Sequence, residues 1–155
     1  MIRTPKEKFH CRLLVTGRNK LNLLGLDKGG GKIEETNKFQ VTLQSLGPVQ
    51  YLSQGEKYSL LLTKAGEVWK VGGESREITK IVFPVSPKYK IELVAACDSL
   101  ALFALEDGQI FSLSKRELNW ANAELVALEG LPETQKKPIK METSKDLAVI
   151  HIQLL

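Results

Sequence analysis

The sequence is poor in the residues that most often carry chemistry. Its 155 residues include two cysteines and two histidines, and only 6% are aromatic. Two cysteines cannot form a disulfide framework, so we expect a nuclear or cytoplasmic protein in a reducing compartment. No apolar run approaches the roughly 18–20 residues that cross a bilayer, and the N-terminus lacks the apolar core of a signal peptide. The sequence therefore predicts neither secretion nor a membrane span.

The scarcity of reactive side chains also argues against an enzyme. His10, Cys11, Cys97 and His151 are possible metal ligands by type, but no Cys-x-x-Cys or His-x-x-x-His spacing joins them. Cys97 lies in the apolar stretch AACDSLALF, where a thiol is usually inert packing. We therefore predict no catalytic residue, no cofactor and no metal.

What the sequence does contain is an internal repeat. Residues 49–71, VQYLSQGEKYSLLLTKAGEVWKV, align without a gap with residues 91–113, IELVAACDSLALFALEDGQIFSL. Gly66 falls on Gly108, an offset of 42 residues. A period of this size is typical of propellers and repeat arrays, in which no unit buries its apolar face alone. The chain is therefore predicted to hold a few copies of one β unit.

Each copy reads as three strands. The first has an alternating strand from Val49, an apolar strand over Tyr58–Thr63, and a return strand over Glu67–Val71. Gly66 lies in the loop before the return strand, and the second copy has Asp-Gly at that place, a strong hairpin signal. We expect two successive antiparallel sheets built to one plan.

A third, degraded copy ends the chain without its return strand. Ile139-x-Met141-x-Thr143 resembles the alternating strand, and Leu147–Ile152 resembles the apolar strand in one of two registers that differ by one residue. At the other end, Cys11–Gly17 looks like a return strand with no apolar strand before it. Closed propellers commonly join their two ends in this way, pairing the last strand with the first. The sequence thus divides one hairpin between its ends.

Two motifs resemble a known family. The first copy reads Gly55-x-x-Tyr58-Ser59-Leu60-x-Leu62-Thr63-x-x-Gly66-x-Val68-Trp69 and is similar to the repeat of the regulator-of-chromosome-condensation family. The stretch Gly17-x-Asn19-x-x-Asn22-x-Leu24-Gly25 is similar to the loop of that family, with Asn22 in place of a glycine. Asparagine tolerates the left-handed region, so this change is mild. The resemblance implies a β-propeller, and the family's propellers typically have seven blades.

These observations predict an all-β fold: a partial β-propeller of about three blades of antiparallel strands. We expect a single domain over residues 1–155, with repeat units at about 13–66, 67–108 and 109–152 and a flexible tail over 1–10. A short helix is predicted between blades over Ser114–Leu128, with Ser114 as N-cap and Glu117 three residues later.

An arc of three blades exposes two sheet edges. Two copies could close a six-blade ring, a different protein could supply about four further blades, or the arc could stay open with covered edges. We expect a non-catalytic interaction or scaffold subunit whose partner is another protein or a second copy, joined by intermolecular strand pairing. The residues expected to bind the partner are Arg12, Leu14, Arg18, Trp120, Leu147, Val149 and His151.

Two other functions stay open. The net charge is +4, and basic residues gather near the N-terminus, which suits association with chromatin or nucleic acid. The resemblance also implies guanine-nucleotide exchange on a small GTPase, although that activity in the family uses a complete ring and an inserted wedge. No membrane partner is expected.

Overall fold

The computed structural model describes residues 13–27, 31–83, 90–114, 124–126, 136–143 and 148–154. Nearly all of this is antiparallel β-sheet, as predicted. The strands are β1 Leu13–Arg18, β2 Glu35–Thr42, β3 Val49–Gln54, β4 Ser59–Thr63, β5 Val68–Val71, β6 Ile78–Ile81, β7 Ile91–Ala96, β8 Leu100–Leu105, β9 Ile110–Ser114, β10 Glu124–Leu125, β11 Lys136–Thr143 and β12 Ala148–Leu154. Two single 3-10 turns, Lys20–Asn22 and Gln44–Leu46, join strands near the N-terminus.

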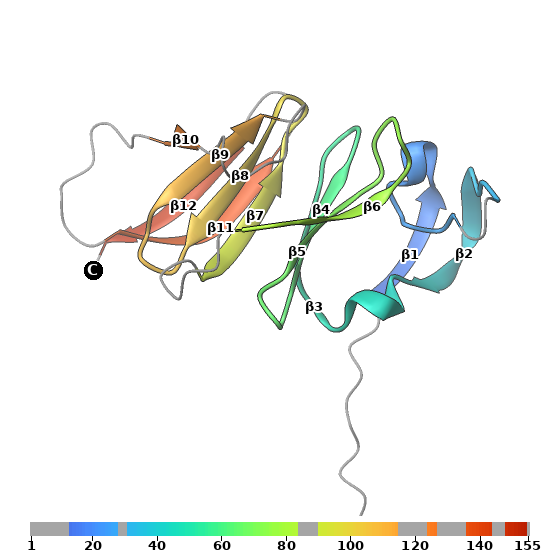
Figure 1. Cartoon of the computed structure of the whole chain (residues 1–155), viewed down its shortest axis with the longest axis horizontal. Coiled ribbons are helices and arrows are strands. Elements are labelled where there is room, and N and C mark those ends of the chain that lie inside the picture. Colours follow the sequence, from blue (N-terminus) through green and yellow to red (C-terminus); the bar gives the residue numbers. More distant parts are fainter. Residues whose placement is uncertain are drawn as a thin grey trace, which may run out of the picture.

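The strands form four sheets that follow one another along an arc (Figure 1). Two sheets have four strands, in the orders β3-β4-β5-β6 and β7-β8-β9-β10, and each is a complete propeller blade. The other two sheets are hairpins, β1-β2 at one end of the arc and β11-β12 at the other. The two halves of the divided hairpin therefore stand at opposite ends of the chain's arc.

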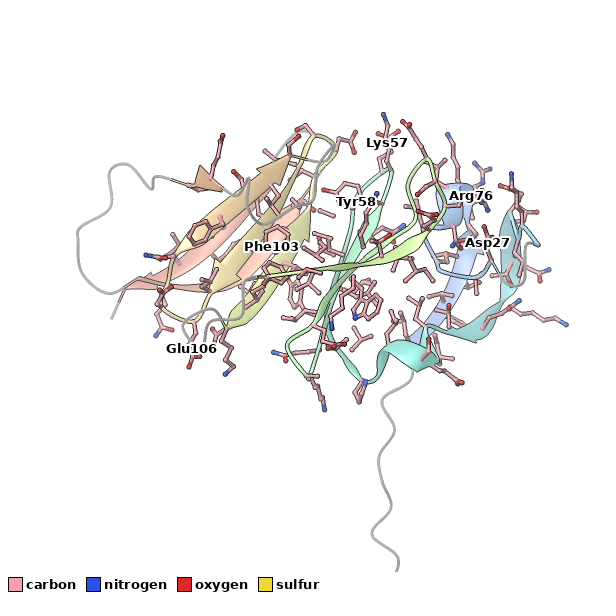
Figure 2. All side chains as sticks on the ribbon, in the orientation of Figure 1. Asp27, Lys57, Tyr58, Arg76, Phe103 and Glu106 are labelled. Atoms are coloured by element: carbon pink, nitrogen blue, oxygen red, sulfur yellow. The ribbon has the colours of Figure 1, made fainter. Side chains whose placement is uncertain are left out.

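The complete blades have the strand chemistry that the repeat predicted. All five residues of β4 are buried, as expected of a strand covered on both faces. Gly66 and Gly108 lie in the hairpin turns with φ of 82° and 88°, which a residue with a Cβ adopts only with strain. Between the two blades, Leu60 and Leu62 pack with Phe103 in the larger of two apolar clusters. Tyr58 and Phe103 lie at the centre of the molecule in Figure 2.

A β-bulge at one fixed position shows which residues are equivalent in the three units. The partners before the bulge are Val49 and Thr63 in the first unit, Ile91 and Leu105 in the second, and Pro138 and Ile152 in the third. The bulge settles the register of the last apolar strand, which the sequence leaves uncertain by one residue: Ile152 is equivalent to Leu105. The alternating strand was misaligned by one residue, because Pro138 and not Ile139 is equivalent to Ile91. A shift of one residue exchanges the two faces of a strand.

The predicted helix over 114–128 is wrong wherever the structure describes it. Ser114 is not an N-cap but the last residue of β9, where it pairs with Leu100. Glu124 and Leu125 form a short strand that pairs with Ser112 and Phe111. Ladder bonds to β9 thus outweigh the local helix signals. Residues 115–123 and 127–128 lie outside the described part.

A buried polar loop holds the N-terminal hairpin to the first complete blade. Asn19 donates to the Ile33 carbonyl at 2.7 Å and accepts from the Leu24 amide at 2.8 Å. Asp27 accepts from Arg76 Nε at 2.7 Å and from Nη2 at 3.0 Å, and Figure 2 places these two side chains together. The left-handed conformation expected of Asn22 is confirmed by its φ of 59°.

The last hairpin also reaches the first complete blade past the blade between them. The Tyr51 hydroxyl of β3 donates to the Met141 carbonyl of β11 at 2.9 Å. Met141 is buried in the second apolar cluster together with Leu93 and Leu102, and Tyr51 packs against the same cluster. The innermost strands β3, β7 and β11 therefore lie next to one another around one axis.

Candidate interface: two sheet edges

The two terminal hairpins supply complementary halves of one blade. By the bulge register, β11 and β12 are equivalent to the first two strands of a blade, β3 and β4. β1 corresponds to the third strand, β5, because each has a glycine of positive φ at its C-terminal end: Gly17, the penultimate residue of β1, at 109°, and Gly72, directly after β5, at 82°. Among the described residues, β1 pairs only with β2 and β12 only with β11. Each hairpin thus lacks the strand that the other carries.

The backbone of β12 is directed towards the missing strand. The Thr63 amide donates to the Glu67 carbonyl, and the Leu105 amide to the Gln109 carbonyl, each at 2.9 Å and each to the residue just before the third strand. Ile152 is equivalent to both residues, so its amide points away from β11. Alternate residues of an edge strand present their amides and carbonyls to the same side. β12 is therefore an edge able to accept a further strand.

The N-terminal hairpin carries exposed apolar side chains on its outer face. Leu13 and Val15 of β1 are half-buried, whereas Leu14 is 56% exposed. Phe39 of β2 is 73% exposed. Large apolar side chains in such positions usually mark a contact surface when they lie close together. Leu14 pairs with position 41 of β2, and Phe39 is two residues from that position on the same strand. The side chains of Leu14 and Phe39 therefore belong to one region of this hairpin.

An apolar position of β3 is uncovered where its equivalents are buried. Leu52 is 44% exposed, whereas Val94 of β7 and Met141 of β11 are 0% and 2% exposed. Each buried equivalent is covered by the first two strands of the preceding blade. Among the described strands, Leu52 has only the hairpin β1-β2 before it. It also lines an open groove of about 570 Å³ between β3 and β11-β12, together with Val149.

The outer face of the last hairpin is polar. Lys140, Glu142 and His151 are exposed and Val149 is 43% exposed. Lys140 and Glu142 form an ion pair; their hydrogen bond raises the pKa of Lys140 and lowers the pKa of Glu142. The equivalent positions in the preceding blade are buried and apolar: Leu93, Ala95, Leu102 and Ala104. Terminal units of repeat arrays commonly carry a polar outer face of this kind.

Four of the seven residues expected to bind a partner are described, and all four are exposed: Leu14, Arg18, Val149 and His151. The structure places them on two edge strands at opposite ends of the arc, so they do not form one continuous site. Arg12, Trp120 and Leu147 lie outside the described residues. Sequence reasoning missed Leu52, whose exposure depends on which strands precede it.

Two side chains with ionisable groups, Cys97 and Tyr58, are buried in the core. Cys97 is buried, and its burial together with nearby Asp98 raises the pKa of the thiol. The Tyr58 hydroxyl donates to the Leu100 carbonyl at 2.7 Å, and burial raises its pKa. In the part of the chain that the structure describes, no three His, Cys, Asp or Glu residues gather as metal ligands. None of the described helices is long and apolar enough to cross a membrane.

Comparison with known proteins shows a shared fold. No family model and no curated protein matches the sequence. Human WBSCR16 superposes with a TM-score of 0.68 over 94% of this chain at 15% identity. Prp20p from Saccharomyces cerevisiae, whose structure is described with its binding to Gsp1p and histones, superposes with a TM-score of 0.62 over 93% of the chain at 15% identity. The fold is that of a regulator-of-chromosome-condensation-like propeller.

The chain spans only part of either neighbour. The superposition covers 41% of WBSCR16 and 40% of Prp20p. Since sequence identity is low, the comparison carries the architecture alone. It agrees with an arc of two complete blades and two half-blades.

Proposed function

We propose that this protein is a non-catalytic interaction subunit that binds another protein chain through the sheet edges β1 and β12. One observation carries the proposal: the two hairpins at the ends of the arc correspond to the two halves of one blade. Among the described residues, β1 and β12 each have a strand neighbour on one side and none on the other. Exposed edges are templates for strand pairing and are rarely left uncovered. Strand addition supplies affinity through main-chain hydrogen bonds.

The position of Ile152 gives a direct test. An Ile152→Pro substitution removes the outward amide and leaves the inner ladder to β11 intact, which edge strands tolerate. Ile152→Ala is the matched control, because it shortens the same side chain but keeps the amide. Protein partners would be cross-linked in native extract and identified with wild type and both variants. We expect Ile152→Pro alone to lose its partner; full retention of binding by this variant would refute edge pairing.

A non-catalytic role also accounts for the side chains of the core. Cys97 is buried with a raised pKa, opposite to what a nucleophilic thiol requires. We expect the protein to act in the nucleus or cytoplasm, where free thiols are normal. An activity that survived edge blocking and needed Cys97 would contradict this assignment.

The binding of Gsp1p and histones by Prp20p motivates two alternatives for this chain, nucleotide exchange on a small GTPase and association with chromatin or nucleic acid. Accelerated nucleotide release from a panel of small GTPases would favour the first. Binding to DNA that weakens steeply with salt would favour the second, because phosphate contacts release counterions. Arg18, exposed at the end of β1, is the described basic residue nearest the N-terminus.

A further inference from the structure

We propose that the partner at both edges is a second copy of this chain, and that two copies close a six-blade ring. This inference rests on the proposed function and specifies which protein chain binds at the β1 and β12 edges. Each copy supplies two complete blades, and each junction joins β12 of one copy to β1 of the other. Six blades lie within the range of about four to eight in which propellers close. The two junctions are related by a twofold axis, so that β1 and β12 of both copies are paired.

The pairing register at the junction follows from the complete blades. In the first blade Leu60, Leu61 and Leu62 of β4 pair with Lys70, Trp69 and Val68 of β5. The shared bulge makes Val149 and Ile150 equivalent to Leu60 and Leu61. The equivalence of Gly17 with Gly72 makes Val15 and Leu14 equivalent to Lys70 and Trp69. The register of the first blade therefore pairs Val149 with Val15 and Ile150 with Leu14. Both central pairs are then apolar, which favours strand association.

The faces of the side chains agree with this register. Ile150 packs towards the β7–β10 blade, and its pairing partner Leu14 lies on the face of β1 that is exposed in the single chain. Paired residues of antiparallel strands point to the same side of a sheet. In the ring, Leu14 would therefore extend the apolar surface that Ile150 begins.

The second copy also covers the uncovered apolar position of the first. In the ring, β11 and β12 of one copy stand before β3 of the other, where Leu52 lacks the cover that Val94 and Met141 have. The outer face of that hairpin brings Val149 towards Leu52, two side chains that are 43% and 44% exposed in the single chain. Its remaining residues, Lys140, Glu142 and His151, meet the end of β3 that carries exposed Gln54.

Cysteine cross-linking tests the junction. Leu14→Cys and Ile150→Cys would be made in separate chains carrying Cys11→Ser, mixed, and oxidised mildly. We expect a covalent pair of twice 17.3 kDa from this mixture only. The matched control mixes Leu14→Cys with Thr143→Cys on β11, which lies one strand further away, at roughly 10 Å, and is beyond disulfide reach.

Light scattering and hydrogen exchange on the unmodified protein complete the test. We expect a dimer mass, with β1 and β12 amides protected in proportion to dimer formation. A monomer at every concentration would overturn the second copy as partner, while leaving the proposed binding of a different protein intact. A dimer that gave no Leu14–Ile150 cross-link, or one equal to the control, would overturn this junction. Loss of the partner on edge blocking tests the broader proposal separately.

Discussion

The β7–β10 blade and the β11-β12 hairpin share one backbone register but present opposite chemistry to the next neighbour along the arc. Leu102 is 5% exposed and its equivalent Val149 is 43% exposed. Leu93 and Ala95 are buried, whereas the equivalent Lys140 and Glu142 carry an exposed ion pair. The side-chain face and the backbone edge of a terminal unit can therefore have different properties. In the single chain the face is polar and exposed to water, while the backbone edge keeps its capacity for pairing.

The N-terminal hairpin resolves the same problem in another way. Its outer face keeps Leu14 and Phe39 exposed, and it is fixed to the first blade by polar contacts of buried Asn22 and half-buried Asp27 with Arg76. Buried polar groups of this kind define one arrangement only when every member has its partner. The two ends of the arc are thus unequal, which suits a head-to-tail contact better than a head-to-head one.

The largest expected effect on the free energy of unfolding comes from comparing equivalent substitutions in the β7–β10 blade and the β11-β12 hairpin. Leu102→Glu places a carboxylate in the apolar cluster and should cost about 4 kcal/mol or more of unfolding free energy. Val149→Glu should change stability of the single chain by about 0.5 kcal/mol or less, since that side chain is already in water. Urea unfolding at a concentration that keeps the chain monomeric measures both. Similar costs at the two positions would show that the outer face of the hairpin is not solvent-adapted.

A smaller effect should mark the contact between the N-terminal loop and the first blade. Gly66 and Gly72 both have φ of 82°, but a Cβ on Gly66 meets nothing, whereas one on Gly72 would lie 2.6 Å from the Leu21 carbonyl oxygen. Gly66→Ala should therefore cost only the left-handed strain, about 1–2 kcal/mol. Gly72→Ala should cost more and should speed hydrogen exchange in β1 and β2. Equal costs would mean that the loop yields without resistance.

The smallest effect concerns the acid stability of that same contact. Hydrogen bonds from Arg76 lower the pKa of Asp27, so its stabilising contribution is complete above the unfolded value of about 3.9 and is lost as pH falls through the lower folded value. Asp27→Asn should lower the urea midpoint at neutral pH and flatten its decline under acid. Glu106→Gln, which removes the exposed ion pair with Lys90, is the control. A decline unchanged by Asp27→Asn would exclude Asp27 as the titrating group.

The repeated hairpins could be predicted because strand periodicity and turn glycines are local signals. Gly66, Gly108 and the apolar run of β4 each identify their structure without a neighbour. The helix over 114–128 failed because Glu124 and Leu125 pair with a strand that precedes them, a contact that their own sequence does not encode. Local propensity is overruled where a ladder is available.

The candidate interface was only half predictable for a related reason. The split hairpin predicts contacts at Leu14 and Val149, and both side chains are exposed on the edge strands. The face of β11 was assigned to the wrong neighbour, because Pro138 and not Ile139 is equivalent to Ile91. Lys140 and Glu142 therefore take the positions of Leu93 and Ala95. Exposure of Leu52 depends on which strands precede it in space, and among the described residues these are only β1 and β2. No pattern around that residue could therefore reveal its exposure.

The hydrogen bond from Tyr51 to Met141 has a consequence for how the molecule melts. In a linear array each unit touches only its neighbours, so units can open one after another from the ends. The Tyr51 hydrogen bond joins the first complete blade directly to the last hairpin, and the β7–β10 blade lies between these two units. Detaching either flank then exposes the middle, so the two blades and the last hairpin should behave as one cooperative block with a single calorimetric transition.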